Sequence, residues 1–135
     1  MKVLIVNGPN LNLLGTREPE IYGNVSMEDY LEKLKSEFSS HELNYYQSNI
    51  EGEIINKIQE DDFDALVINP GAFTHYSYAI ADCLKNIKKP KIEVHISNIY
   101  KREEFRQKSV TAANTDAVLS GFGMDGYRLA ILSLK

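Results

Sequence analysis

Residues 2–7 read KVLIVN, an apolar run that breaks at Gly8-Pro9, and this pattern predicts a short buried β-strand. Four later runs are also short and rich in β-branched or aromatic residues, at positions 43–48, 65–69, 91–95 and 117–120. Between the runs, apolar residues recur three or four positions apart, as on the buried face of an amphipathic helix. The helical patterns carry Met27, Leu31, Leu34 and Phe38, then Ile54, Ile55 and Ile58, then Ile80, Leu84 and Ile87, and finally Tyr127, Ile131 and Leu134.

Strict alternation of strands and helices predicts a parallel sheet, because each crossover helix returns the chain in the same direction. We therefore expect an α/β fold of the flavodoxin-like, doubly wound kind, with five parallel strands and helices on both faces. Ser26, followed three residues later by Asp29, predicts the amino-terminal cap of the first helix. Ligands of such folds bind beyond the carboxyl ends of the strands, so the residues that follow each strand are candidates for a functional site.

Length and composition predict one globular domain over residues 1–135, since 43% of the residues are hydrophobic. Acidic residues outnumber basic ones by 19 to 15, and the basic ones are scattered, which argues against nucleic acid or an anionic membrane as a partner. The apolar run at the start is too short for a signal peptide, and no run reaches the roughly 18 residues of a membrane-spanning helix. Cys83 is the only cysteine, so we expect a protein of the reducing cytoplasm.

The long segment after the first strand carries Arg17 and Tyr22, five residues apart. It contains neither G-x-G-x-x-G nor G-x-x-x-x-G-K-[ST], which argues against a bound dinucleotide or nucleotide. A free tyrosine has a pKa of about 10, and an adjacent guanidinium can lower it enough for Tyr22 to act as a general base. The alternative is a surface arginine and a packed tyrosine, and the spacing allows both.

The third predicted strand ends at Asn69, which places Asn69 and His75 at the crevice. A helix is predicted to follow, with Thr74 as its cap. His75 and Asp82 are seven residues apart on that helix, about 10 Å along its axis, so one small-molecule site on this chain does not use both. If both are functional, Asp82 reaches a neighbouring subunit, and the protein is an oligomer. A solvated helix surface is the alternative for Asp82.

The fourth predicted strand places Glu93, His95 and Ser97 on one face by the period of two. Parallel strands are normally buried and apolar, so a glutamate and a histidine within one are costly unless they are paired. A Glu–His pair at a strand end suits an acid catalyst, because histidine titrates near neutral pH. A structural histidine is the alternative.

Arg102 and Arg106 follow on a predicted helix, four residues apart, where like charges repel unless an anion compensates. An anionic or hydroxyl-rich substrate is one explanation, and pairing with Glu103 or Glu104 is the other. The histidines and Cys83 lack the spacing of metal ligands, and Cys83 lies among apolar residues of a helix, so no metal is expected. No G-x-S-x-G motif marks an acyl-transfer serine either.

Five motifs in order closely resemble the type II dehydroquinase family. They are NGPNLNLLGTREP (7–19), IYG (21–23), NPGAFTH (69–75), IEVHISN (92–98) and REEFR (102–106), and the likeness runs from Val3 to GFGMDGY at 121–127. The resemblance implies a hydro-lyase without a cofactor. It implies anti elimination of water from 3-dehydroquinate through an enolate to give 3-dehydroshikimate, a reaction of the shikimate pathway to chorismate and aromatic amino acids that is shared with quinate catabolism.

The resemblance also implies a role for each matching residue. Tyr22 takes a proton from C2 of the substrate, and Arg17 lowers the pKa of Tyr22. His95, held by Glu93, donates the proton with which the C1 hydroxyl leaves as water. Asn10 holds a water molecule against the enolate oxygen.

Further residues bind the substrate or a neighbouring subunit in proteins of this kind. Ile96 and Ser97 bind the substrate carboxylate, and the ring hydroxyls and carboxylate region are held by Asn69, His75 and Arg106. Asp82 contacts the site of a neighbouring subunit, in a dodecamer built from trimers.

The sequence departs from the family pattern at Tyr76 and Tyr78, where smaller residues are common, and at Ala81, where an arginine is common. We expect these differences to affect packing beside the site and the contact between subunits rather than the chemistry. Two other interpretations are a non-catalytic flavodoxin-like module that binds a small polyhydroxylated acid, and a flavin-binding electron carrier.

Overall fold

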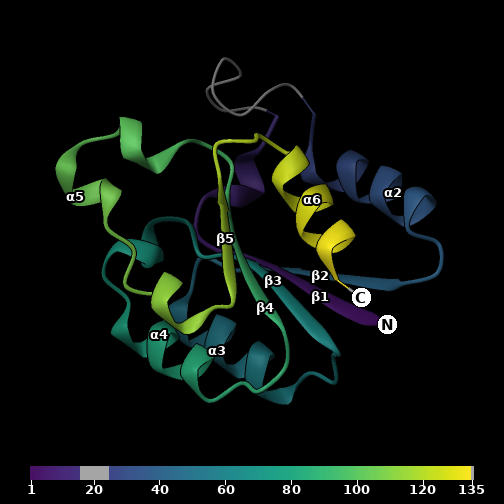
Figure 1. The fold of residues 1–135 in the computed structure, drawn as a ribbon, viewed down its shortest axis with the longest axis horizontal. Coiled ribbons are helices and arrows are strands. Elements are labelled where there is room, and N and C mark those ends of the chain that lie inside the picture. The colour runs from purple at the N-terminus through teal and green to yellow at the C-terminus, as the bar shows by residue number, and fades with distance from the viewer. Residues whose placement is uncertain (16–24, 135) are drawn as a thin grey trace.

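Five parallel strands form one sheet in the order β2-β1-β3-β4-β5 (Figure 1). The computed structural model describes residues 1–15 and 25–134. The strands are β1 (Lys2–Asn7), β2 (Glu42–Gln47), β3 (Ala65–Asn69), β4 (Lys91–His95) and β5 (Ala117–Ser120). All five predicted strands are confirmed, with the second shifted by one residue toward the amino terminus. The strand order changes direction at β1 and β3, which confirms the flavodoxin-like, doubly wound arrangement.

Helices cover both faces of this sheet, as predicted (Figure 1). On one face lie α2 (Met27–Glu37) and α6 (Asp125–Ser133), and on the other lie α3 (Glu51–Glu60) and α4 (Tyr78–Lys85). The short helix α5 (Glu104–Gln107) lies in the connection between β4 and β5. Short 3₁₀ helices occupy other connections, namely η1 (Leu11–Leu13), η2 (Gly71–His75), η3 (Ile99–Lys101) and η4 (Ala112–Asn114). Within the described residues, none of the helices combines the length and apolar character needed to cross a membrane.

The alternation of side chains along β1 divides the core into two layers. Val3 and Ile5 pack in the cluster that contains α2 and α6, whereas Leu4 and Val6 pack in the cluster that contains α3 and α4. Both faces of the central strands are therefore buried, which explains why KVLIVN is continuously apolar instead of alternating with polar residues. Several buried polar side chains, among them Asn7, Asn69 and His95, lie instead where the strands end.

One predicted helix is interrupted. η2 ends at His75 and α4 begins at Tyr78, because the Ser77 hydroxyl accepts a hydrogen bond from the Ile80 amide at 3.0 Å. A continuous helix would instead bond that amide to the carbonyl of residue 76. Thr74 is therefore not the cap, and His75 and Asp82 do not share a helix, so the prediction that placed them about 10 Å apart along one axis is wrong.

Two other local predictions have different outcomes. The Ser26 hydroxyl accepts a hydrogen bond from the Asp29 amide at 3.2 Å, so the predicted cap of α2 is confirmed. Arg102 and Arg106 do not share a helix, because η3 ends at Lys101 and α5 begins only at Glu104. Their spacing along the sequence therefore does not make them neighbours on one helix face.

The ends of β1 and β3 approach each other at a glycine. The Gly8 amide donates a hydrogen bond to the Asn69 carbonyl at 2.8 Å, and a Cβ on Gly8 would lie 2.1 Å from the Pro70 carbonyl oxygen. Only glycine permits this approach, because a side chain would collide with backbone. The loop after β1, which carries Asn10, is thereby held against the loop after β3, which carries His75.

Candidate active site

A cavity of about 220 Å³ lies at the carboxyl ends of β1, β3 and β4, the position expected for a ligand in this fold. Three loops line it, and the lining residues are Pro9, Asn10, Leu11, Leu13 and Leu14; Asn69, Gly71, Ala72 and His75; and His95, Ile96, Ser97, Ile99, Arg102 and Arg106. Most of the site residues that were predicted from the sequence thus surround one space.

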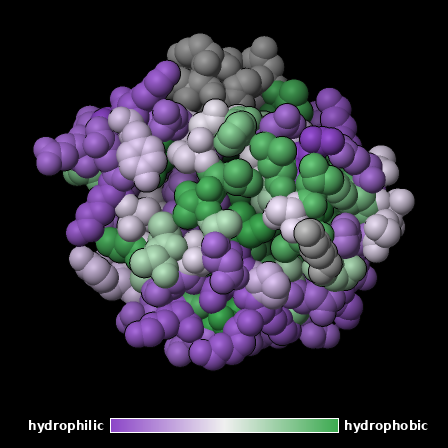
Figure 2. Space-filling view, in the orientation of Figure 1, coloured by the Kyte–Doolittle hydropathy of each residue, from purple (hydrophilic) through white to green (hydrophobic). Residues whose placement is uncertain are grey.

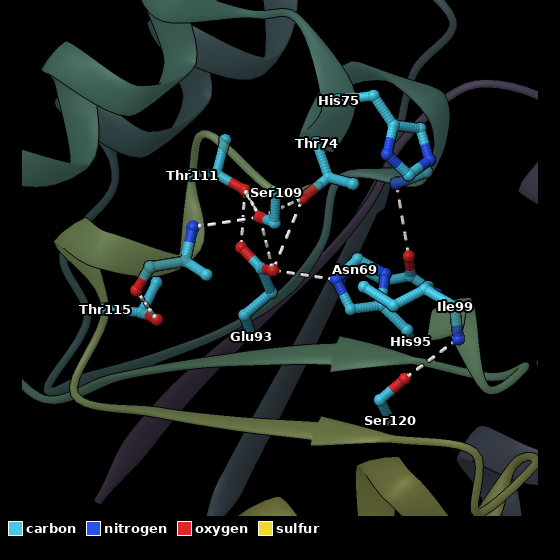
Figure 3. Close-up of polar contacts among 12 residues, drawn as sticks. Asn69, Thr74, His75, Glu93, His95, Ile99, Ser109, Thr111, Thr115 and Ser120 are labelled. Atoms are coloured by element: carbon cyan, nitrogen blue, oxygen red, sulfur yellow. Dashed lines mark hydrogen bonds and ion pairs between the residues drawn. The ribbon is translucent and has the colours of Figure 1, made fainter. Parts of the chain in front are cut away.

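Glu93 and His95 form a buried pair at the end of β4 (Figure 3). They are two residues apart on one strand face, and His95 Nε2 lies 2.7 Å from Glu93 Oε2. The carboxylate accepts, so Nε2 carries the hydrogen and Nδ1 is the nitrogen left to exchange a proton. His95 also lines the cavity, and Glu93, with no exposed surface, lies behind it.

Three hydroxyl groups also surround the Glu93 carboxylate (Figure 3). Thr111 Oγ1 lies 2.5 Å from Oε1, Ser109 Oγ lies 3.0 Å from Oε2, and Thr74 Oγ1 lies 2.6 Å from Thr111 Oγ1. Burial raises the pKa of Glu93, but the hydrogen bond and charge of His95, with the Thr111 and Ser109 hydroxyls, outweigh burial and lower that pKa below its usual range. Glu93 is therefore an anion in the folded protein at neutral pH.

A second buried network holds Asn69. Its side-chain oxygen accepts from the Gly71 amide at 3.1 Å, and its Nδ2 donates to the Tyr127 hydroxyl at 3.0 Å. Tyr127 in turn donates to Asn7 Oδ1 at 2.7 Å. Burial raises the pKa of Tyr127 above its usual range, so the phenol stays protonated. Its hydrogen bonds fix the orientation of the Asn69 amide, with the nitrogen toward Tyr127 and the oxygen toward the Gly71 amide.

The basic side chains of the cavity come from the segments that follow β3 and β4. His75 Nδ1 donates to the Lys108 carbonyl at 2.7 Å, so the other ring nitrogen is the acceptor in the neutral form. Arg106 Nε donates to Glu103 at 3.1 Å, while Arg106 also lines the cavity with Arg102. The sequence left two explanations for these arginines, an anionic substrate and a salt bridge with Glu103 or Glu104. Arg106 forms the salt bridge with Glu103 and also lines the cavity.

Asn10 is held by its backbone. It adopts a left-handed conformation with φ of 69°, and its amide donates to Asn49 Oδ1 at 2.9 Å. Gln47 donates to the same Asn49 oxygen and to the Gly8 carbonyl, both at 3.1 Å. Gln47, the last residue of β2, and Asn49 just beyond it therefore support the loop that brings Asn10 to the cavity.

Three of the predicted site residues remain, namely Asp82, Arg17 and Tyr22. Asp82 is exposed on α4 and is not part of the cavity wall, while Arg17 and Tyr22 fall in residues 16–24, outside the described part of the chain. The departures from the family pattern lie near Asp82: Tyr76 and Tyr78 are largely exposed, and Ala81 is buried. Tyr76 contacts the edge of the Phe73 ring, with 5.9 Å between ring centroids.

The model of the family described as Dehydroquinase class II matches residues 1–135. The chain belongs to this family. One relative, the 3-dehydroquinate dehydratase of Thermotoga petrophila, is 56% identical over 137 residues, which cover 100% of this chain and 95% of that protein. The 3-dehydroquinate dehydratase of Clostridium botulinum is 54% identical over 133 residues, or 96% of this chain and 90% of that protein.

Solved structures of class II dehydroquinases have the same fold. The type II dehydroquinase from Propionibacterium acnes superposes with a TM-score of 0.92 at 41% identity, covering 97% of this chain and 93% of that one. The enzyme from Butyrivibrio crossotus gives a TM-score of 0.91 at 52% identity, covering 97% and 94%. The family membership expected from the five motifs is thus confirmed over the whole length.

The sequence did not point to the residues that support the Glu93–His95 pair and Asn69. Ser109 and Thr111 follow α5 in an irregular segment, and Tyr127 was predicted only as part of the apolar face of a helix. Within residues 1–15 and 25–134, no group of three or more His, Cys, Asp and Glu side chains is placed to hold a metal ion. The expectation that the protein needs no cofactor stays a prediction.

Proposed function

We propose that this chain is a 3-dehydroquinate dehydratase of type II, which removes water from 3-dehydroquinate by anti elimination to give 3-dehydroshikimate. The observation that supports this most is the buried Glu93–His95 pair, whose histidine lines a small cavity at the carboxyl end of the sheet. Family membership supports the same reaction. Residues 1–135 would act as one catalytic domain in the cytoplasm, in a shikimate pathway that makes aromatic amino acids.

His95 is the proton donor in this proposal. Its Nε2–H is bonded to the Glu93 anion, so the transferred proton leaves from Nδ1 and protonates the C1 hydroxyl, which departs as water. Tyr22, as phenolate beside Arg17, removes the C2 proton and generates the enolate, whose collapse forms the C1–C2 double bond. A phenol and a neutral imidazole remain, and solvent returns the proton from one to the other. The cycle begins with a proton on both ring nitrogens of His95, and the Glu93 carboxylate accepts the hydrogen bond from Nε2–H.

Substrate binding is assigned to the polar groups around the cavity. Ile96 and Ser97 would hold the carboxylate through their backbone amides and the Ser97 hydroxyl. The ring hydroxyls and the carboxylate region would be held by Asn69, His75 and Arg106, and Asn10 would hold the water beside the enolate oxygen. The arginine is suited to a carboxylate because its guanidinium keeps several donors after Nε bonds Glu103.

A homo-oligomer, a dodecamer of trimers, is part of the proposal. β5 is an edge strand on which Val118 is exposed, and Phe122 and Leu132 are exposed nearby. Figure 2 shows apolar residues gathered over β5 and α6, with hydrophilic residues around them. An uncovered edge strand with apolar side chains favours association. Asp82, exposed on α4, would reach a neighbouring subunit's site. Light scattering after gel filtration measures the mass of the assembly.

The enzyme assay follows absorbance of the enone product after 3-dehydroquinate is mixed with the purified protein, with and without a chelator. Turnover that resists the chelator and is lost in Tyr22→Phe and in His95→Ala supports the reaction and both proton carriers. No turnover by the wild-type protein would reject the proposal and favour a non-catalytic binding module.

A further inference from the structure

The hydroxyl groups behind Glu93 can be assigned as donors by counting protons. Six oxygen–oxygen contacts of 3.3 Å or less join Thr74, Ser109, Thr111 and Glu93, yet the three hydroxyls supply three protons. The shortest contact, 2.5 Å, joins Thr111 Oγ1 to Glu93 Oε1. Ser109 Oγ accepts from the Ala112 amide at 3.0 Å, which leaves its own proton for Glu93 Oε2, also at 3.0 Å.

Thr74 completes the arrangement as the donor to Thr111. Its hydroxyl lies 2.6 Å from Thr111 Oγ1 and 3.3 Å from Glu93, so the shorter contact takes its proton. Glu93 then accepts from Thr111, Ser109 and His95 and has no proton of its own. Donors at both oxygens make the carboxylate a fixed acceptor, because the proton of a protonated carboxyl would compete with a hydroxyl for the same contact.

The segment that carries these hydroxyls is itself fixed to the loop after β3. The Val110 amide donates to the Thr74 carbonyl at 2.7 Å, and His75 Nδ1 donates to the Lys108 carbonyl at 2.7 Å. Thr74 and Thr111 are fully buried. The same short segment therefore supports His75 at the cavity and the hydroxyls behind Glu93.

We propose that Thr111 and Ser109 are positioning residues for the dehydration. Their hydroxyls hold Glu93 as the acceptor of His95 Nε2–H, and this sets which ring nitrogen of His95 faces the substrate. The inference rests on the proposed function. Neither residue touches the cavity, so both act through Glu93 and His95.

The inference predicts a change in the dependence of activity on pH. Glu93 has a lowered pKa and acts as an anion, so activity is present above that pKa and lost as the pH falls through it. Removal of a hydroxyl donor raises the pKa of Glu93, so activity is then lost at a higher pH. The other basic side chains near the pair are His75 on η2 and Arg102 and Arg106 near α5, which line the same cavity as His95.

The experiment compares profiles of kcat and kcat/KM from about pH 3 to about pH 9 for the wild type, Thr111→Val, Thr111→Ser and Ser109→Ala. Thr111→Val keeps the shape of the side chain and removes the donor. We expect the acid limb of the Thr111→Val profile, where activity falls at low pH, to move up by about one to two pH units. This is the size expected for one hydrogen bond to a charged group. We expect kcat at neutral pH to fall about tenfold with KM within about twofold, and Thr111→Ser to restore both.

Thr115→Val is the matched control. Thr115 lies four residues further on and its hydroxyl donates to the Ala112 carbonyl at 2.8 Å, away from Glu93 (Figure 3). We expect its profile to follow the wild type. In a Glu93→Gln background, which lacks the titrating carboxylate, Thr111→Val should move no limb.

The outcomes separate this inference from the proposed function. An inactive wild-type protein rejects the function. An active wild type whose acid limb is unmoved in Thr111→Val, or moved equally in Thr115→Val, overturns the inference alone. Should Thr111→Val lose its cooperative thermal transition, Ser109→Ala decides: a limb shifted upward supports the positioning role, and an unshifted limb rejects it.

Discussion

Replacement of Tyr127 by phenylalanine removes one buried oxygen and leaves the ring in place. That oxygen accepts from Asn69 at 3.0 Å and donates to Asn7 at 2.7 Å, and all three side chains are buried. No cavity forms, so the cost comes from two amides that each lose a partner. Each unsatisfied buried group costs about 1–2 kcal/mol, so we expect the free energy of unfolding to fall by about 2–4 kcal/mol.

The change is measurable as melting temperature and as KM. With an unfolding entropy of about 2.1 cal/mol/K per residue, each kcal/mol lowers Tm of this 135-residue chain by roughly 3–4 °C, so Tyr127→Phe should melt about 7–14 °C lower. We also expect KM to rise several-fold, because the Asn69 amide is free to turn. Tyr30→Phe is the control, since its hydroxyl bonds Asp125 at 3.1 Å near the surface. Equal melting temperatures for Tyr127→Phe and the wild type would refute the reasoning.

Three further predictions concern a close backbone approach, a helix and a thiol. Gly8→Ala should lower both stability and turnover, measured by thermal denaturation and the enone assay, because its Cβ would lie 2.1 Å from the Pro70 carbonyl oxygen; an unchanged variant would contradict this. Gly52→Ala, where a Cβ meets nothing within 4 Å in α3, should instead stabilise by about 0.5–1 kcal/mol. Burial raises the pKa of the Cys83 thiol, so a thiol reagent at pH 8 should react slowly until denaturant is added, whereas fast reaction with the folded protein would count against that burial.

The sequence predicted the sheet well because its strands are short apolar runs separated by clear turn signals. It failed where one polar side chain decided the local backbone. Ser77 ends one helical segment and caps the next, yet a serine within a helical pattern is also compatible with a continuous helix. The spacing of Arg102 and Arg106 misled in the same way, because η3 and α5 are separate turns.

The sequence pointed to the site where a residue type is rare in the helix or strand that carries it. Glu93 and His95 stand out because charged and titratable residues are rare in a buried parallel strand. Ser109 and Thr111 carry no such signal, since hydroxyl residues are ordinary in an irregular segment. Their role depends on the contact between residues 74 and 111, which the tertiary fold alone creates.

The stereochemistry of the elimination tests most directly whether two separate side chains carry the two protons. 3-Dehydroquinate labelled with deuterium at one or the other C2 position is converted, and the label in 3-dehydroshikimate is measured by mass spectrometry. The account predicts loss of the deuterium that lies anti to the C1 hydroxyl and retention of the other. Loss of the syn deuterium would contradict it, because acid and base would then act from one face.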